Sequence, residues 1–215
     1  MKNSKLRKVL LLACSAVLLV CLSVGATIAY LTSNDTVTNT FTVGNVQIKL
    51  DEAKANTDGS LVPDAERVKA NSYKLLPGHT YNKDPMVTVL NGSESCYVKM
   101  TMSISKSAAL DAIFAPDGAN MISIFNGYNS TNWIYQGNTV TDDVRTYEFW
   151  YKETVAAPTA DVPLDALFDS ITVPSTINNN QLATISGMEI TVNAYAIQAD
   201  GFNTPELAWA AYAAQ

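Results

Sequence analysis

The chain has 215 residues, with 20 acidic and 14 basic side chains, and a formal net charge of -6 at neutral pH. Four of the basic residues lie within the first eight positions, so the chain beyond them carries 10 basic against 20 acidic residues. This acidity argues against nucleic acid as a partner, because the phosphate backbone selects basic surfaces. The 186 residues after position 29 are enough for one substantial domain, and no linker divides them.

The first 29 residues have the three regions of a cleavable signal peptide. A basic head precedes an uncharged apolar stretch over 9–24, and small residues follow at positions 25, 26 and 29. We expect cleavage between Ala29 and Tyr30, with a cut after Ala26 as the second choice. An uncleaved anchor over 9–29 is the alternative, since 21 uncharged residues can span about 30 Å of hydrocarbon. A lipid anchor on Cys21 is a weaker alternative, because Val20 is large for that kind of signal.

Cysteine usage fits an exported chain without disulfides. Cys14 and Cys21 lie within the signal peptide, so Cys96 stands alone after cleavage and has no internal partner. This usage fits a Gram-positive bacterium better than an animal secretion route. Next to Tyr97 and Val98, Cys96 is expected to be a small core residue rather than a reactive thiol.

Residues 30–43 directly follow the expected cleavage site and read as a strand. They are rich in Thr and Asn, and apolar side chains are spaced along them at Tyr30, Leu31, Val37, Phe41 and Val43. Cleavage would release an N-terminus that is ready to pair as β-structure. An ordinary first strand within its own sheet is the alternative.

The chain then shows several segments in which apolar and polar residues alternate, as in half-buried strands. Expected strands cover 45–50, 86–90, 97–104, 133–135, 144–151, 171–173 and 188–198, with Val98, Met100, Met102 and Ile104 on one face, and Ile190, Val192 and Ala194 on another. Asn91-Gly92 predicts a hairpin, with a loop running on to Ser95 as the alternative, and Gly137-Asn138 predicts a chain reversal.

Few segments predict helix. Ser107 and the apolar run over 108–114 read as one short capped helix, and Thr204-Pro205 opens another. Three side chains are expected to dock that last helix on the sheet: Leu207, Trp209 and Tyr212. The stretches 53–70 and 155–164 read as exposed loops. The pattern predicts an all-β fold, an antiparallel jelly-roll-like sandwich with a few short helices, as a single domain over 30–215.

The residues offer little for catalysis. His79 is the chain's single histidine and follows Pro77-Gly78 in a turn, so a two-histidine metal site cannot form. A serine triad is poorly supported, because no serine lies in a Gly-x-Ser-x-Gly turn. We therefore predict no catalytic residue, no metal ligand and no cofactor. A carboxylate-only calcium site around Asp51, Glu52 and Asp58, or at Asp142-Asp143, stays open, although the spacing of a calcium loop is missing.

Aromatic residues gather in two of the expected strands. They are Trp133, Tyr135, Tyr147, Phe149, Trp150 and Tyr151. A carbohydrate-binding platform is one interpretation, but their positions within strand patterns favour core or cross-strand packing.

Several segments resemble the TasA and camelysin family of exported proteins. At the N-terminus these are GATIAYLT over 25–32 and NTFTVGNV over 39–46. Further along they are LPGHTYNKDP over 76–85, VTV over 87–89 with NGSE over 91–94, and ITVNAYAIQADGF over 190–202. The likeness covers nearly the whole chain in the same order, and residues 105–160 match least.

The resemblance implies a secreted jelly-roll subunit of Gram-positive bacteria that assembles into extracellular biofilm matrix or cell-surface fibres. Its signal is then cut by a SipW-type peptidase, and the membrane is touched only through the signal before cleavage. The partner is another copy of the chain, with an accessory matrix protein and the cell wall as further candidates. Residues 30–43 are implied to be a donor strand that completes a neighbour's sheet, with Gly44 as its pivot.

Two other functions stay open. The family includes camelysins, which are described as peptidases, so a secreted metallopeptidase is the second hypothesis. The sequence lacks a His-Glu-x-x-His motif, and we therefore transfer the architecture without the activity. A cell-surface carbohydrate-binding module is the third.

Overall fold

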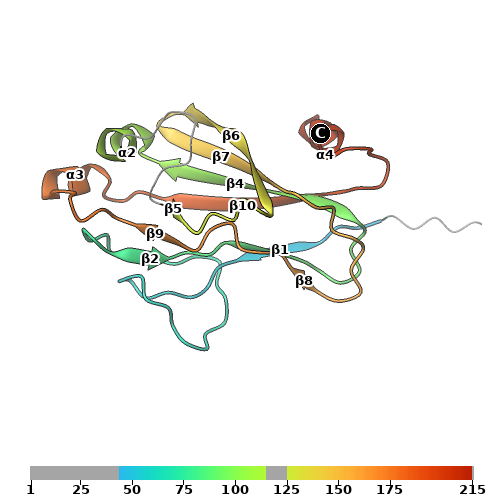
Figure 1. The fold of residues 1–215 in the computed structure, drawn as a ribbon, viewed down its shortest axis with the longest axis horizontal. Coiled ribbons are helices and arrows are strands. Elements are labelled where there is room, and N and C mark those ends of the chain that lie inside the picture. The colour runs from blue at the N-terminus through green and yellow to red at the C-terminus, as the bar shows by residue number, and fades with distance from the viewer. Residues whose placement is uncertain (1–43, 115–124, 215) are drawn as a thin grey trace, which may run out of the picture. The chain divides into compact units, whose positions relative to one another are not determined.

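The largest sheet of the computed structural model has four antiparallel strands in the order β10-β4-β7-β6 (Figure 1). They are β10 (Ile190–Gln198), β4 (Cys96–Ser105), β7 (Val144–Tyr151) and β6 (Trp133–Thr141). The predicted inner face of β4 is confirmed, since its four alternate apolar residues over 98–104 are fully buried. Residues 44–114 and 125–214 are described by the structure, so the signal peptide and the segment 30–43 lie outside the described residues.

Two smaller antiparallel sheets complete the described fold. One has the order β1-β3-β8, from β1 (Ile48–Asp51), β3 (Met86–Val89) and β8 (Val162–Pro163). The other has the order β2-β9-β5, from β2 (Thr80–Asn82), β9 (Ser170–Thr172) and β5 (Phe125–Asn126). Buried Val87, Tyr81 and Ile171 from these sheets share one core with the inner face of the four-stranded sheet. The described chain is thus mostly antiparallel β-sheet, as predicted.

Among the described residues, three short helices flank the sheets. The two predicted ones are present as α2 (Ser107–Phe114) and α4 (Pro205–Ala213). The third, α3 (Asn179–Thr184), was not predicted, although Asn178 and Gln181 form the capping box that marks its start. In α4 the docking prediction is wrong for Leu207, which is 55% exposed, while Trp209 is buried. The two residues differ by about 200° around a helix, so they cannot face the sheet together.

The hairpin predicted at Asn91-Gly92 and the chain reversal predicted at Gly137-Asn138 are both absent from those positions in the structure. β3 and β4 belong to different sheets, so Asn91-Gly92 lies in a loop between sheets and not in a hairpin. Gly137-Asn138 lies inside β6, next to a register shift, and the chain reverses at Asp142-Asp143 instead. Both of these aspartates have positive φ, 51° and 62°, as a two-residue type I′ hairpin requires.

The same hairpin supplies the cap of α2. The carboxylate of Asp143 accepts hydrogen bonds from the Ala108 amide at 2.8 Å and from the Ser107 hydroxyl at 3.2 Å. Asp143 is therefore a helix cap brought by the tertiary fold, and the calcium interpretation of Asp142-Asp143 is not supported.

The loop prediction is right for most of 53–70 and only in part for 155–164. Val155 and Leu164 are buried at the two ends of that second stretch, and Val155 pairs with Cys96 as a β-bridge. Cys96 is itself fully buried, as predicted, and burial raises the pKa of its thiol to about 11.

Candidate binding groove

The outer edge of β10 has open backbone groups. Ser105 donates its amide to the Glu189 carbonyl at 3.1 Å, and Ala199 donates to the Ser95 carbonyl at 2.7 Å. In an antiparallel pair these bonds recur at every second residue, so the odd-numbered positions of β10 bond to β4. The N–H and C=O groups of the even positions, from Ile190 to Ala196, point away from the sheet. Within the described chain no other strand pairs with this edge.

The outer edge of β1 is open only in part, because directly after it Glu52 pairs with Val68 as a β-bridge. Leu90 donates its amide to the Gln47 carbonyl at 2.9 Å, which sets the residues of β1 that bond to β3. By the same alternation, Ile48 and Leu50 turn their backbone groups away from β3. The carbonyl of Leu50 accepts a hydrogen bond from the Lys69 ammonium at 2.5 Å. β1 lies beside β10, and Cα atoms of the two strands come within 8 Å of one another.

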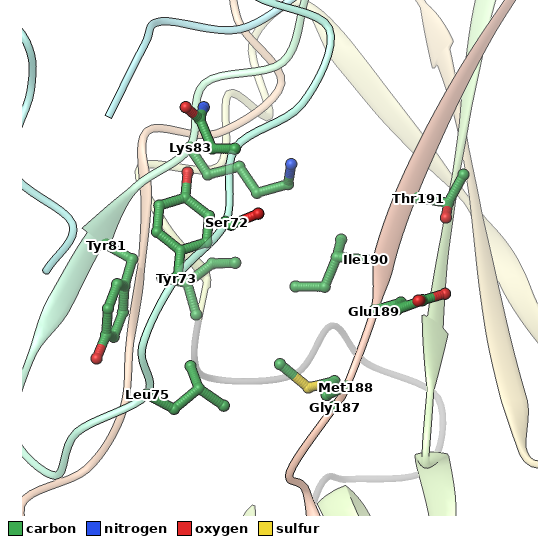
Figure 2. Close-up of a pocket in the computed structure, with 12 residues that line it drawn as sticks. Ser72, Tyr73, Leu75, Tyr81, Lys83, Gly187, Met188, Glu189, Ile190 and Thr191 are labelled. Atoms are coloured by element: carbon green, nitrogen blue, oxygen red, sulfur yellow. The ribbon is translucent and has the colours of Figure 1, made fainter. Parts of the chain in front are cut away.

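A groove runs along β10, and we call it the β1–β10 groove because β1 lines one of its two halves. The other half, which we call the apolar half although polar side chains also line it, is a cleft of about 470 Å³ between β10 and the segment 71–75, in which Met188 and Ile190 face Tyr73 and Leu75 (Figure 2). Its charged half, of about 380 Å³, is lined by residues including Leu50, Glu52, Lys69, Pro85 and Val192. Both halves share Asn71, Lys83, Ile190 and Thr191, so they are continuous.

The wall of the groove contains a buried ion pair. The ammonium of Lys83 lies 2.5 Å from a carboxylate oxygen of Glu52, with side chains 10% and 7% exposed. The Asn71 amide donates to the other oxygen of Glu52 at 3.0 Å. Both oxygens of the carboxylate are therefore hydrogen-bonded, as a buried charge requires.

A second ion cluster fixes the loop that carries Lys69. Arg67 reaches Asp51 at 2.6 Å and Asp84 at 2.8 Å, and Lys49 reaches Asp51 at 2.7 Å. Burial acts to raise the pKa of Asp51, but the hydrogen bonds from Lys49 and Arg67 outweigh it and hold that pKa below its ordinary value. Burial acts to lower the pKa of Arg67, but the carboxylates of Asp84 and Asp51 outweigh it and hold that pKa above its ordinary value.

The tyrosines of the apolar half are fixed by backbone acceptors. The Tyr73 hydroxyl donates to the Asn82 carbonyl at 2.6 Å, and the Tyr81 hydroxyl donates to the Lys74 carbonyl at 2.7 Å. The two rings meet edge to face, with centroids 5.4 Å apart. Burial, together with the nearby charge of Glu52, raises the pKa of Tyr73, so its hydroxyl stays neutral at physiological pH. Hydrogen bonds and an ion pair thus hold the walls of the groove in place, and apolar side chains gather toward one end while charged side chains gather toward the other.

The possible calcium ligands at the start of the chain do not assemble into a site. Asp51 and Glu52 are occupied by basic partners, and Asp58 accepts hydrogen bonds from the amide and hydroxyl of Ser60. Across the described residues, no three His, Cys, Asp or Glu side chains are grouped to hold a metal ion. His79 is exposed on a turn, where its amide donates to the Leu76 carbonyl.

The aromatic residues do not form a platform for sugars. Trp133, Tyr147 and Phe149 are fully buried in the core, as the strand pattern favoured. Trp150 is half-buried on the other face, where its ring lies 6.4 Å from that of Trp209 in α4. The aromatic side chains are therefore split between two faces of the sheet.

Sequence reasoning missed the groove because its walls come from segments more than 100 residues apart, 71–75 and 187–192. One signal was available, since β10 is a nine-residue strand without a charged side chain. Gly44, the predicted pivot, is exposed ahead of β1, and an added Cβ would lie 3.0 Å from Cγ of Glu94. The cleavage site and the donor residues lie outside the described residues.

No helix among the described residues is long and apolar enough to cross a membrane. Comparison with protein-family models, with curated proteins and with solved structures gave no match to this chain.

Proposed function

We propose that this chain is a secreted structural subunit of an extracellular biofilm matrix or cell-surface fibre. In this proposal, residues 30–43 of one copy enter the β1–β10 groove of the next. The observation that carries it is the groove itself, which runs along the unpaired edge of β10. A strand placed there would bond to β10, and β1 would move aside to bond to its other edge, because Cα atoms of β1 and β10 already lie within 8 Å and a strand between them needs about 9.6 Å.

The composition of both partners supports this assignment. Long exposed sheet edges usually carry Pro or charged residues such as Lys, which prevent pairing with another chain. β10 has none of these residues. In an extended segment, Leu31, Val37, Phe41 and Val43 share one face, while Tyr30 and the threonines of 32–42 share the other. The first face is apolar enough to fill the apolar half of the groove.

The geometry of the contact leads to a fibre. A segment at the N-terminus of one copy meets a groove on the body of the next, so the contact is head to tail. Such contacts extend into filaments unless the rotation closes a ring. The jelly-roll path is part of the same proposal, because the inserted strand would join the β1 sheet to the four-stranded sheet.

The test compares two matched variants of the processed chain by electron microscopy and light scattering. Val37→Ser with Phe41→Ser removes apolar side chains from the inward face, and Thr36→Ser with Thr40→Ser changes the outward face. We expect the first variant to lose fibres and the second to keep them. Equal assembly of both, or intact fibres after deletion of 30–43, would refute strand donation.

A further inference from the structure

Lys69 is a cation at the mouth of the groove that has no acidic partner. Its side chain is exposed, and its ammonium donates to the Leu50 carbonyl at 2.5 Å. Among the described residues it belongs to none of the ion pairs. The other lysine of the charged half, Lys83, is already matched by Glu52.

The hydrogen bond of Lys69 occupies a group that an inserted strand needs. The Leu50 carbonyl is one of the open acceptors on the edge of β1, and an amide of an incoming strand would bond to it. The incoming strand would then displace the Lys69 ammonium from this carbonyl and shield it from water. A charge that loses both water and its partner is costly, so a new anionic partner is required there.

The segment 30–43 has one charged residue, Asp35. In an extended chain it lies on the same face as Leu31, Val37 and Phe41, because side chains alternate with a period of two. The face that would enter the groove therefore carries a single carboxylate, together with the polar Ser33 and Asn39 and four apolar side chains.

We propose that Lys69 recognises Asp35 of a neighbouring copy, and that this ion pair sets the register of the inserted strand. The inference rests on the proposed function, because it assumes that 30–43 occupies the groove. With Asp35 at Lys69, beside Val192, Phe41 lies about 20 Å along the strand. Residues 187–192 of the groove span about 16 Å, so Phe41 lies just beyond Gly187, and Asn39, about 13 Å along the strand, lies level with Met188.

The test is a charge reversal in the processed chain, recovered from an exporting host. Asp35→Lys and Lys69→Glu are made singly and together, and elongation is followed by light scattering at low salt. Each single variant should slow elongation roughly threefold to tenfold, and the double variant should recover to within about twofold of wild type. These differences should shrink in about 1 M salt.

Lys74→Glu is the matched control. Lys74 is exposed in the same segment and does not line the groove, so the same charge change there should not rescue Asp35→Lys. If Lys69→Glu fails to fold by circular dichroism, Lys69→Gln replaces it. In that background Asp35→Asn should elongate at least as fast as the chain that keeps Asp35, because the carboxylate has already lost its cation, and slower elongation overturns the pairing.

The outcomes separate the two proposals. If wild type forms fibres and the single reversals elongate at its rate, Lys69 does not recognise Asp35, although strand donation stands. Equal rescue by Lys74→Glu also overturns the pairing, since it would reflect net charge alone. If the processed wild-type chain forms no fibre, the proposed function fails and this inference fails with it.

Discussion

Replacement of Lys83 by Met should strongly destabilise the domain, because it leaves Glu52 as a buried charge without its counterion. The two side chains are 10% and 7% exposed, and the pair forms part of the groove wall. Removing one partner of a buried pair costs about 3 to 5 kcal/mol. In a domain of this size the melting temperature falls roughly 2 to 4 °C per kcal/mol, so the expected decrease is roughly 6 to 20 °C.

The double variant Lys83→Met with Glu52→Leu is the informative comparison. It removes both charges, so its stability should lie within about 1 kcal/mol of wild type or above it. Lys74→Met is the control for loss of an exposed lysine and should change stability by less than about 0.5 kcal/mol. Thermal unfolding is followed by circular dichroism of the β signal. A melting temperature of Lys83→Met equal to that of Lys74→Met would refute the reasoning, as would a double variant no better than the single.

Four further predictions follow from the same structure. Ala194→Pro removes an amide from the open edge of β10 and should block fibre growth in a folded chain, whereas Asn193→Pro breaks a bond to β4 and should cost about 3 kcal/mol of stability; equal melting temperatures for the two variants would contradict the assigned edge. The lowered pKa of Asp51 adds stability above its unfolded pKa that is lost as the pH falls below about 4, so acid titration should destabilise wild type more than Asp51→Asn. The buried thiol of Cys96 should react with a thiol reagent only after denaturant is added, and rapid labelling of the native chain would show that it is accessible. Because acidic residues outnumber basic ones by 20 to 10 after the first 29 positions, assembly should speed up at mildly acid pH or raised salt, and flat scattering across both series would reject this.

Local sequence patterns predicted the regular elements well. The alternation over 97–104 places four side chains of β4 in the core, and it needs only the two-residue period of a strand. The cap and proline at 204–205 located the start of α4 for the same local reason. The errors came where contacts between distant residues decide the structure. Asp143 caps α2 from a hairpin 36 residues away. Asn91-Gly92 lies in a loop that joins strands of two different sheets, and not two paired strands.

The sequence by itself determined the acidic charge, the strand periods and the alternation of apolar with polar residues over 37–43. These properties depend on composition and on neighbours within a few residues. Only the tertiary structure decided which strands are left at sheet edges, since hydrogen-bond partners of β10 and β1 are chosen across the whole chain. It also decided that Lys83 would be buried against Glu52 while Lys69 stays unpaired beside the groove. Both are lysines that line the charged half of the groove, and burial, which no local pattern encodes, makes them different.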